Sequence, residues 1–199
     1  LPPPLREDVL ACPRWAERQG RVLGRLLLRQ GLERLGLGAF SRLGGWFLGP
    51  FGRPGLEGLP GDFSISHARG LAVCALNPGG RVGVDVEARA LTDLDALRPV
   101  FHPREWEEIL ASAEPGRTAA RLWTAKEAAL KADGRGLALE PSDVDARGPA
   151  VVVDGAAWNI ARPEVGPDWT CALASLNPPG EMEIVRMPLQ IIPNLAREE

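Results

Sequence analysis

The sequence of 199 residues predicts an α+β fold built from two similar halves, residues 1–100 and 101–199. Each half contains an amphipathic helical stretch together with short segments in which apolar and polar residues alternate, as they do in strands. Two segments that each predict a strand, an Asn-Pro turn and a second strand also resemble one another. They are Leu71–Gly80 and Cys171–Gly180, which coincide at Ala72/Ala172, Leu76/Leu176, Asn77/Asn177, Pro78/Pro178 and Gly80/Gly180. A chance match between two common hairpins is the alternative, but related halves would enclose a cleft, which is a favoured ligand site.

The first part of the chain predicts one long helix followed by strands. Residues 14–35 place leucines near helical spacing with arginines interleaved between them, which favours an amphipathic helix. Residues 38–61 are rich in Gly and Pro and predict loop or short strand. Residues 63–76 and 81–87 predict strands.

Helices are predicted in the middle of the chain and strands towards its end. Thr92 with Asp95 forms a capping-box pattern ahead of a short helix, and Pro103 suits the first turn of another. Residues 117–133 are rich in Ala and Leu and predict the best helix of the chain, which ends before Gly134. Further strands are expected at residues 150–153, 157–161, 169–176 and 181–187, and the tail from residue 188 is expected to be peripheral.

The composition excludes several classes of protein. No apolar run approaches the length that spans a bilayer, and the N-terminus lacks the basic-then-apolar pattern of a secretion signal. The cysteines, Cys12, Cys74 and Cys171, are odd in number and lack metal-ligand spacing, which argues against a disulfide framework and a zinc site. These features predict a protein of the reducing cytoplasm that acts away from membranes.

Charge is unevenly distributed along the chain. The formal net charge is −3, yet residues 1–53 contain nine Arg against only four acidic residues. A basic N-terminal part on an acidic protein favours a local anionic ligand, whereas a nucleic-acid binder would more often be basic overall. The alternative is an Arg-rich solvated helix, which the charge pattern alone fits equally well.

The chain has 21 arginines and two lysines, and both lysines lie within residues 126–131. An ammonium is a compact charge that can give up a proton, whereas a guanidinium stays charged. Two lysines kept together beside Glu127 in an Arg-only background therefore indicate a chemical role. The alternative is that two surface lysines survived by chance in a codon-biased chain.

The segment Val82–Glu87 alternates strictly, as a strand does. Because side chains on a strand point to opposite faces in turn, Asp85 and Glu87 share one face and the valines share the other. Two like charges so close are unfavourable unless a cation lies between them. An all-oxygen ligand set favours Mg²⁺ or Mn²⁺ over zinc. The alternative is a solvated strand face that merely contains two acids.

Glu127 and Lys131 lie four residues apart in the predicted helix and therefore share one face, although such a pair is also an ordinary stabilising surface pair. Lys126 projects about 140° away from Lys131, since successive helical residues turn by about 100°. The two lysines are therefore expected to contact different parts of a long ligand. Upstream, Ser66-His67 follows an alternating strand. A lone His is more often structural, but its place ahead of the acidic strand makes His67 a candidate phosphate contact.

These motifs together resemble those of the 4′-phosphopantetheinyl transferases, specifically the larger Sfp-type group. That family has an acidic strand Gly-(Ile/Val)-Asp-x-Glu, matched by Gly83–Glu87, and a helix Trp/Phe-(Ser/Cys/Thr)-x-Lys-Glu-(Ala/Ser)-x-x-Lys, matched by Trp123–Lys131. Its Gly-Lys/Arg-Pro, Ser-His and Gly-Lys-Gly-Leu elements are matched by Gly52–Pro54, Ser66-His67 and Gly134–Leu137. The ordered matches cover most of the chain, which departs from the pattern at Ser64, where Asn is common.

The resemblance implies the family's fold, a pseudo-dimer of two α/β halves with the active site in the cleft between them. It also implies an enzyme that transfers the 4′-phosphopantetheine arm of coenzyme A to a serine hydroxyl of an apo acyl or peptidyl carrier protein. The other product is 3′,5′-ADP. Carriers of fatty-acid, polyketide and nonribosomal-peptide synthesis all fit, and enzymes of this group tend to act as monomers.

The resemblance further implies a role for each matched residue. Asp85, Glu87 and Glu127 are expected to hold Mg²⁺, with Mn²⁺ as the other candidate, against the diphosphate of coenzyme A. Glu127 is expected to accept the serine proton, and Lys131 to neutralise the diphosphate and protonate the leaving group. The other expected contacts with coenzyme A are Lys126 on a phosphate, His67 and Arg53 near the 3′-phosphate beside Ser66, and Arg14 or Arg18 on the nucleotide.

Two other functions fit the same residues. A Mg²⁺-dependent hydrolase of nucleotide diphosphates would need the same three carboxylates but no carrier protein. A non-catalytic module that binds coenzyme A or a carrier protein would keep the fold without turnover. The intact acids and both lysines favour an enzyme over such a module.

Overall fold

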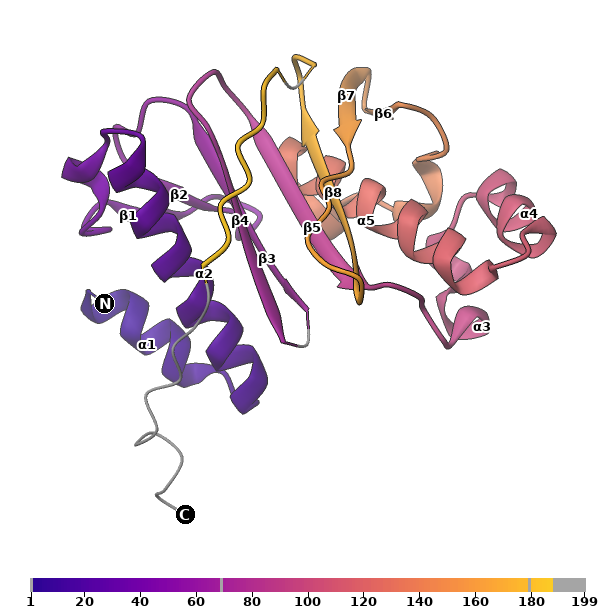
Figure 1. Ribbon diagram of the computed structural model, residues 1–199, viewed down its shortest axis with the longest axis horizontal. Helices are drawn as coiled ribbons and strands as arrows, with labels where there is room; N and C mark the ends of the chain where they lie inside the picture. Colours follow the sequence, from indigo (N-terminus) through magenta and orange to yellow (C-terminus); the bar gives the residue numbers. More distant parts are fainter. Residues whose placement is uncertain (1, 69, 179, 188–199) are drawn as a thin grey trace.

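Two long helices each cover strands that follow or precede them in the chain (Figure 1). Helix α2, Trp15–Arg34, packs on strands β3, Asp62–Ala68, and β4, Leu71–Asn77. Helix α5, Pro115–Asp133, packs on β5, Val82–Ala88, and β8, Trp169–Ser175. The computed structural model describes residues 2–68, 70–178 and 180–187. The remaining helices and strands are α1 Pro3–Ala11, β1 Trp46–Leu48, β2 Pro54–Leu56, α3 Leu94–Leu97, α4 Pro103–Ala111, β6 Ala150–Val153 and β7 Ala156–Ala161.

In the described residues the strands form three antiparallel sheets. Strands β1 and β2 form one hairpin, β3 and β4 form a second, and the third sheet has the order β5-β8-β7-β6. Within the third sheet β5 pairs with β8 along its full length, so that Asp85 lies opposite Ala172. This pairing joins the last strand of the first half of the chain to the last strand of the second half.

Glycines bring α2 close to the β3–β4 hairpin. A Cβ atom on Gly24 would lie 2.3 Å from Cγ2 of Ile65, and one on Gly31 would lie 2.3 Å from Cδ1 of Leu76. Between helix and hairpin, Leu28 and Phe63 are almost completely buried. The glycines therefore lower helix propensity in exchange for a close fit that fixes β3, the strand that carries Ser66 and His67.

A similar close approach places α5 on β5. A Cβ atom on Gly83 would lie 2.0 Å from the carbonyl oxygen of Ala128 and 2.5 Å from the amide nitrogen of Ala132. Both alanines are fully buried. Because side chains alternate along a strand, the face of β5 that carries Gly83 also carries Asp85 and Glu87. That acidic face is therefore turned towards α5.

Side chains join β3 to β5, although the two strands belong to different sheets. The amides of Val82 and Val84 donate to Oδ2 of Asp62 at 3.0 Å and to Oγ of Ser64 at 3.0 Å. Ser66 continues the series by donating to Oδ1 of Asp85 at 2.8 Å. The side chains of Asp62 and Ser64 on β3 thus accept hydrogen bonds from two backbone amides of β5, which a neighbouring strand would otherwise accept. The hydroxyl of Ser64, the departure from the family pattern, has a defined role here.

The predicted α+β class and most predicted elements are confirmed. The predicted helices at residues 14–35 and 117–133 correspond to α2 and α5, and Gly134 ends α5 with a positive φ of 98°. In the described part of the chain, α2 is followed by the five strands β1 to β5, and α5 is followed by the three strands β6 to β8. The division at residue 100 remains a prediction.

Several local predictions were wrong. The expected strand at residues 181–187 is extended chain without a ladder in the described residues, so β8 ends its half instead of starting a second hairpin. The similarity at an offset of 100 therefore aligns β4 with β8, whereas the order of elements makes β5 the counterpart of β8. The cap of α3 is Asp93, which accepts from the Ala96 amide, and not Thr92. Helix α1 was not anticipated in the Pro-rich start. The tail from residue 188 lies outside the described residues.

No helix in the described part of the chain is both long enough and apolar enough to cross a membrane.

Candidate active site

The centre of the site is a triangle of polar groups from β3, β5 and α5. Nζ of Lys131 donates to Oδ1 of Asp85 at 2.6 Å and to Oγ of Ser66 at 3.1 Å. Ser66 in turn donates to the same Oδ1 atom at 2.8 Å. Asp85 and Ser66 are buried, whereas Lys131 is partly exposed. An ionised pair linked through a buried hydroxyl holds all three groups in fixed positions.

Two carboxylate oxygens beside this triangle are buried and lack a partner. Oδ2 of Asp85 and Oε1 of Glu127 make no hydrogen bond to any described residue. Buried polar atoms are rarely left unpaired, and an unpaired one calls for an explanation such as an ion that binds there. No three His, Cys, Asp or Glu side chains among the described residues are arranged as a ready metal cage. The site thus offers oxygen ligands to a cation without enclosing one.

The carboxyl groups of the site influence one another. Burial raises the pKa of Glu127, Asp85 and Glu87 raise it further, and the charge of Lys131 opposes them. Burial likewise raises the pKa of Glu87, with a further contribution from Asp85, while a hydrogen bond from Trp123 opposes the shift. The three predicted acids are therefore close enough to interact, and a divalent cation would relieve their mutual repulsion.

His67 follows Ser66 on β3 and lies near the positive charges of Lys131 and Arg21 and the negative charge of Glu17. Its ring packs against α2, where a Cβ atom on Gly20 would lie 2.5 Å from Cγ of the imidazole. Burial lowers the pKa of His67, and the charges of Lys131 and Arg21 lower it further. A cluster of His67, Lys131 and Arg21 is suited to an anion such as a phosphate group. Sequence reasoning noted Arg21 only as one of the interleaved arginines of the helix.

Lys126 lies apart from this cluster in the structure, and its expected contact with a phosphate stays a prediction. Its side chain is fully buried on the opposite side of α5 and pairs with the equally buried Glu105, Nζ to Oε2 2.7 Å. Nζ also donates to the carbonyl of Val100 at 2.8 Å and lies over the ring of Phe101. The predicted divergence of the two lysines is confirmed, but only Lys131 points to the site. Glu105 was missed because no local pattern signals a contact between two helices.

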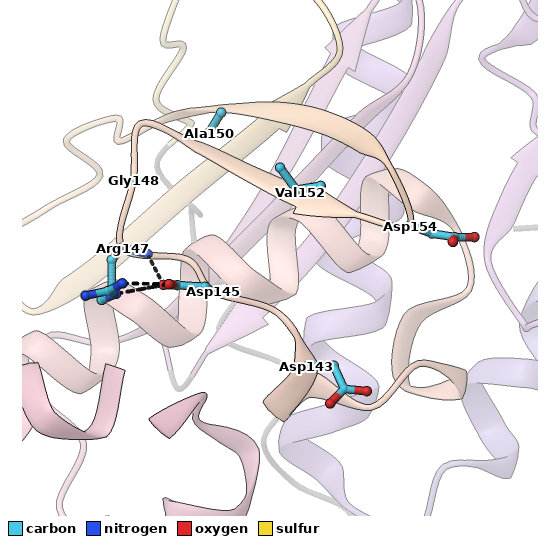
Figure 2. A pocket seen from close by; sticks show the side chains of 7 residues that line it. All are labelled: Asp143, Asp145, Arg147, Gly148, Ala150, Val152 and Asp154. Carbon is cyan, nitrogen blue, oxygen red and sulfur yellow. Dashed lines mark hydrogen bonds and ion pairs between the residues drawn. The ribbon is translucent and has the colours of Figure 1, made fainter. Parts of the chain in front are cut away.

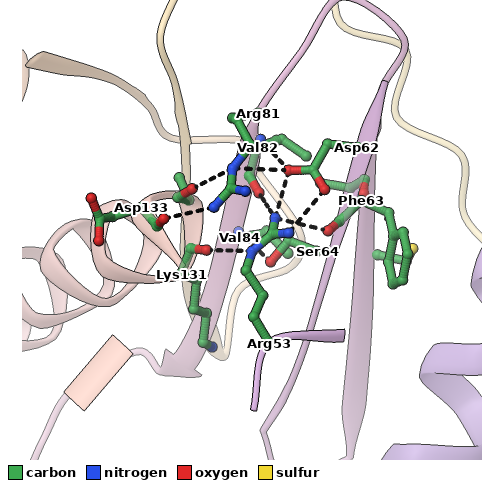
Figure 3. Close-up of polar contacts among 12 residues, drawn as sticks. Arg53, Asp62, Phe63, Ser64, Arg81, Val82, Val84, Lys131 and Asp133 are labelled. Carbon is green, nitrogen blue, oxygen red and sulfur yellow. Dashed lines mark hydrogen bonds and ion pairs between the residues drawn. The ribbon is translucent and has the colours of Figure 1, made fainter. Parts of the chain in front are cut away.

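Arg53 is engaged by protein groups in the structure, and its expected contact with the 3′-phosphate stays a prediction. Its guanidinium binds Asp62 through two hydrogen bonds, Nη1 to Oδ1 3.0 Å and Nη2 to Oδ2 2.5 Å (Figure 3). Nε donates to the carbonyl of Lys131 at 2.7 Å, and Nη2 also approaches the carbonyls of Val82 and Phe63. All three nitrogens thus have protein partners.

The two N-terminal candidates lie near the start of α2. Arg14 has a side chain that is 81% exposed and pairs with Glu17 at 3.3 Å. Arg18 donates through Nε to the carbonyl of Cys12. Their role in binding a nucleotide remains a prediction, and Arg21, one turn further along, is the arginine of α2 whose charge acts on His67.

One surface depression lies apart from this site. It has a volume of about 750 Å³ and is lined by Asp143, Asp145, Arg147, Gly148, Ala150, Val152 and Asp154 (Figure 2). None of the predicted site residues lines it. Arg147 is held by Asp145 at 2.8 Å, so the lining offers neither a spare cation for a phosphate nor a nucleophile.

Comparison with known proteins agrees with the geometry. Residues 81–162, which include the acidic strand and α5, match the model of the 4′-phosphopantetheinyl transferase superfamily. The 4′-phosphopantetheinyl transferase HetI of Nostoc sp. is 37% identical over 119 residues, which are 56% of this chain and 49% of that protein. The 4′-phosphopantetheinyl transferase Sfp of Bacillus subtilis is 30% identical over 92 residues, which are 45% of this chain and 41% of that protein.

The chain thus spans about half the length of the curated relatives it matches, or somewhat less. Among solved structures, the holo-[acyl-carrier-protein] synthase of Thermotoga maritima resembles it with a TM-score of 0.37 and 18% identity, over 47% of this chain and 61% of that one. A likeness that weak adds nothing to the sequence matches. The motifs on β5 and α5 thus lie in the part of the chain that is similar to the 4′-phosphopantetheinyl transferase superfamily and to the HetI and Sfp proteins.

Proposed function

We propose that this chain carries the active site of a Mg²⁺-dependent transferase that moves the 4′-phosphopantetheine arm of coenzyme A to a serine of an apo carrier protein. The observation that supports it most is the position of Glu127 and Lys131 on α5 against Asp85 on β5. The similarity of residues 81–162 to the 4′-phosphopantetheinyl transferase superfamily supports the reaction class. The carrier is an acyl or peptidyl carrier protein.

The proposed reaction forms one bond and breaks one. The serine oxygen attacks the phosphorus that carries the pantetheine arm, and the bond between that phosphorus and the oxygen of 3′,5′-ADP breaks. Glu127 accepts the serine proton, since burial keeps the pKa of this carboxyl above that of an ordinary Glu. Lys131 balances the charge that grows on the leaving phosphate and gives it a proton. Ser66 holds Lys131 and Asp85 in register.

Asp85, Glu87 and Glu127 fit a divalent cation by their chemistry. All three offer oxygen, and two unpaired buried oxygens belong to Asp85 and Glu127. Mg²⁺ commonly binds one or two carboxylates, several waters and the phosphates of a substrate, so a complete protein cage is not required. When bound, Mg²⁺, or Mn²⁺ in its place, would withdraw charge from the diphosphate and make it a better electrophile.

The anion cluster of His67 and Arg21 is proposed to bind the 3′-phosphate of coenzyme A. Two observations support this proposal. The charges of Lys131 and Arg21 act on His67, and His67 is the residue next to Ser66 on β3. Arg14, the N-cap of α2, and Arg18 lie nearer the start of that helix than Arg21 and are proposed as outer contacts. Lys126 and Arg53 are left out of this proposed binding, because Lys126 pairs with the buried Glu105 and Arg53 pairs with Asp62, whose side chain is 11% exposed.

The reaction is tested by measuring 3′,5′-ADP release from coenzyme A and Mg²⁺ with apo acyl carrier protein, with apo peptidyl carrier protein and with no carrier. We expect release only with a carrier whose serine is intact, and loss of release in Glu127→Gln with coenzyme A affinity largely retained. Release without any carrier would make the protein a hydrolase. Binding of coenzyme A without release would make it a binding module.

A further inference from the structure

The end of α5 is held by arginines from outside the helix. The last carbonyls of a helix have no partner within it. Here Nε of Arg53 donates to the carbonyl of Lys131 at 2.7 Å. Arg81 donates to the next two carbonyls, those of Ala132 at 3.0 Å and Asp133 at 2.6 Å (Figure 3). Three consecutive carbonyls are thus satisfied by two guanidinium groups.

The other side of the Arg53 guanidinium is attached to β3 and β5. Asp62 of β3 binds it through both carboxylate oxygens, and the carbonyl of Val82 in β5 accepts from Nη2 at 2.9 Å. Asp62 also accepts from the Val82 amide at 3.0 Å, so the carboxylate serves both the strand and the arginine. The Arg53 and Asp62 side chains are only 16% and 11% exposed. A forked ion pair that is largely shielded from solvent in this way has well-defined geometry.

The three elements joined by this pair are the three that supply the triangle. Ser66 lies on β3, Asp85 lies on β5, and Lys131 lies in the last turn of α5. The contact of Arg53 with Lys131 is to the main chain of that residue, so it fixes where the Lys131 side chain begins. The Lys131 side chain is long and flexible. It contacts Asp85 and Ser66 reproducibly only if the backbone of Lys131 is held in a fixed position relative to β5.

We propose that Arg53 and Asp62 act together as positioning residues for Lys131, and that Arg53 touches neither coenzyme A nor its 3′-phosphate. The assay of this role rests on the proposed transferase function. A lysine at position 53 would keep the charge but could not make parallel bonds to Asp62 while also reaching the Lys131 carbonyl. The pair therefore depends on guanidinium geometry and not on positive charge alone.

The test compares coenzyme A with 3′-dephospho-coenzyme A as donors for the same carrier protein. Arg53→Gln and Asp62→Asn should each lower kcat by about tenfold or more with both donors. The KM for coenzyme A and the preference for it over the dephospho form should stay near wild type. The double variant should lose no more than the worse single variant, since the two residues act as a unit. The kcat of Arg53→Lys should stay as low as that of Arg53→Gln and not return to the wild-type value.

His67→Ala and Arg147→Gln provide the reference variants. His67→Ala should reduce the preference for coenzyme A over the dephospho form, as expected of a 3′-phosphate contact. Arg147→Gln, a matched change at an arginine remote from the site, should leave all parameters unchanged. A fall in the same preference for Arg53→Gln, with kcat preserved, would overturn the positioning role and assign Arg53 to the phosphate.

Hydrogen exchange of the ligand-free protein gives a second measurement that does not depend on activity. Arg53→Gln should speed the exchange of amides in the last turn of α5, residues 130–133, while the middle of α2 keeps its protection. Unchanged protection of that turn would contradict the inference. If the wild-type protein transfers nothing to any carrier, the proposed function fails, and hydrogen exchange alone decides whether the pair holds the helix end.

Discussion

Nζ of Lys126 and Oε2 of Glu105 lie 2.7 Å apart with both side chains fully excluded from solvent. Glu105 also accepts the amide of Ala146 at 2.7 Å and the amide of His102 at 2.8 Å. One buried carboxylate therefore links α4, α5 and the chain ahead of β6. The ion pair is a structural feature of the helix that carries Glu127. It accounts for the presence of Lys126 without a ligand.

Lys126→Met should destabilise the protein strongly, by about 3–5 kcal/mol, because it leaves Glu105 as an uncompensated buried charge. Thermal or urea unfolding measures this loss. Lys126→Met combined with Glu105→Gln should be more stable than Lys126→Met alone, since the neutral amide still accepts from the Ala146 amide. A Lys126→Met protein of normal stability but weak coenzyme A affinity would show that Lys126 binds a phosphate after all.

Gly83→Ala should separate α5 from β5. The new Cβ would meet the backbone of Ala128 at 2.0 Å, which no side-chain movement can relieve. We expect a loss of about 1–3 kcal/mol of stability, as for other overpacked sites, together with loss of turnover because Glu127 and Lys131 shift from Asp85. Gly44→Ala is the control, since nothing lies within 4 Å of a Cβ built at that position. Wild-type turnover in Gly83→Ala would contradict the close packing.

The raised pKa of Glu127 predicts a pH-dependent stability. A carboxyl whose folded pKa exceeds its ordinary value of 4.5 stabilises the fold below that pH, and this contribution is lost as pH rises through the folded pKa. In metal-free buffer at pH 7.5, Glu127→Gln should therefore raise Tm by about 2–4 °C, and the gain should shrink towards pH 4.5. The exposed Glu107→Gln serves as control. A lower Tm for Glu127→Gln at pH 7.5 would mean that its charge is stabilised within the fold.

Ser66→Ala should uncouple the two ends of the triangle. The change removes the hydroxyl that donates to Asp85 and accepts from Lys131, but it leaves their direct ion pair in place. We expect a loss of about 1 kcal/mol of stability and a fall in kcat of about tenfold, measured by 3′,5′-ADP release. An unchanged kcat would remove Ser66 from the site.

The elements with strong local patterns were predictable from the sequence. Helix α5 has a run of Ala and Leu and a glycine stop, and Glu127 and Lys131 follow from helical spacing. Asp85 and Glu87 follow from the strict alternation of their strand. These signals are local, so they place the central groups of the candidate site without any knowledge of the fold.

The features that could not be predicted from the sequence depend on contacts between segments that are distant in the chain. The roles of Lys126 and Arg53 are set by Glu105 and Asp62, which no spacing rule connects to them. Residues 181–187 have strand-like composition, but a strand needs a neighbour to pair with, and this segment is held by side chains instead. Glu183 pairs with Arg34 at 2.7 Å, and Arg186 donates to the carbonyl of Glu164 at 3.2 Å.

The central claim, that Asp85 and α5 form the active site of a phosphopantetheine transferase, is tested most directly by the intact mass of an apo carrier protein. The carrier is incubated with coenzyme A, Mg²⁺ and either the wild-type protein or Asp85→Ala. We predict that the wild-type protein adds the mass of one phosphopantetheine arm and that Asp85→Ala adds nothing. An unmodified carrier with the wild-type protein, across acyl and peptidyl carriers, would contradict the account, as would full modification by Asp85→Ala.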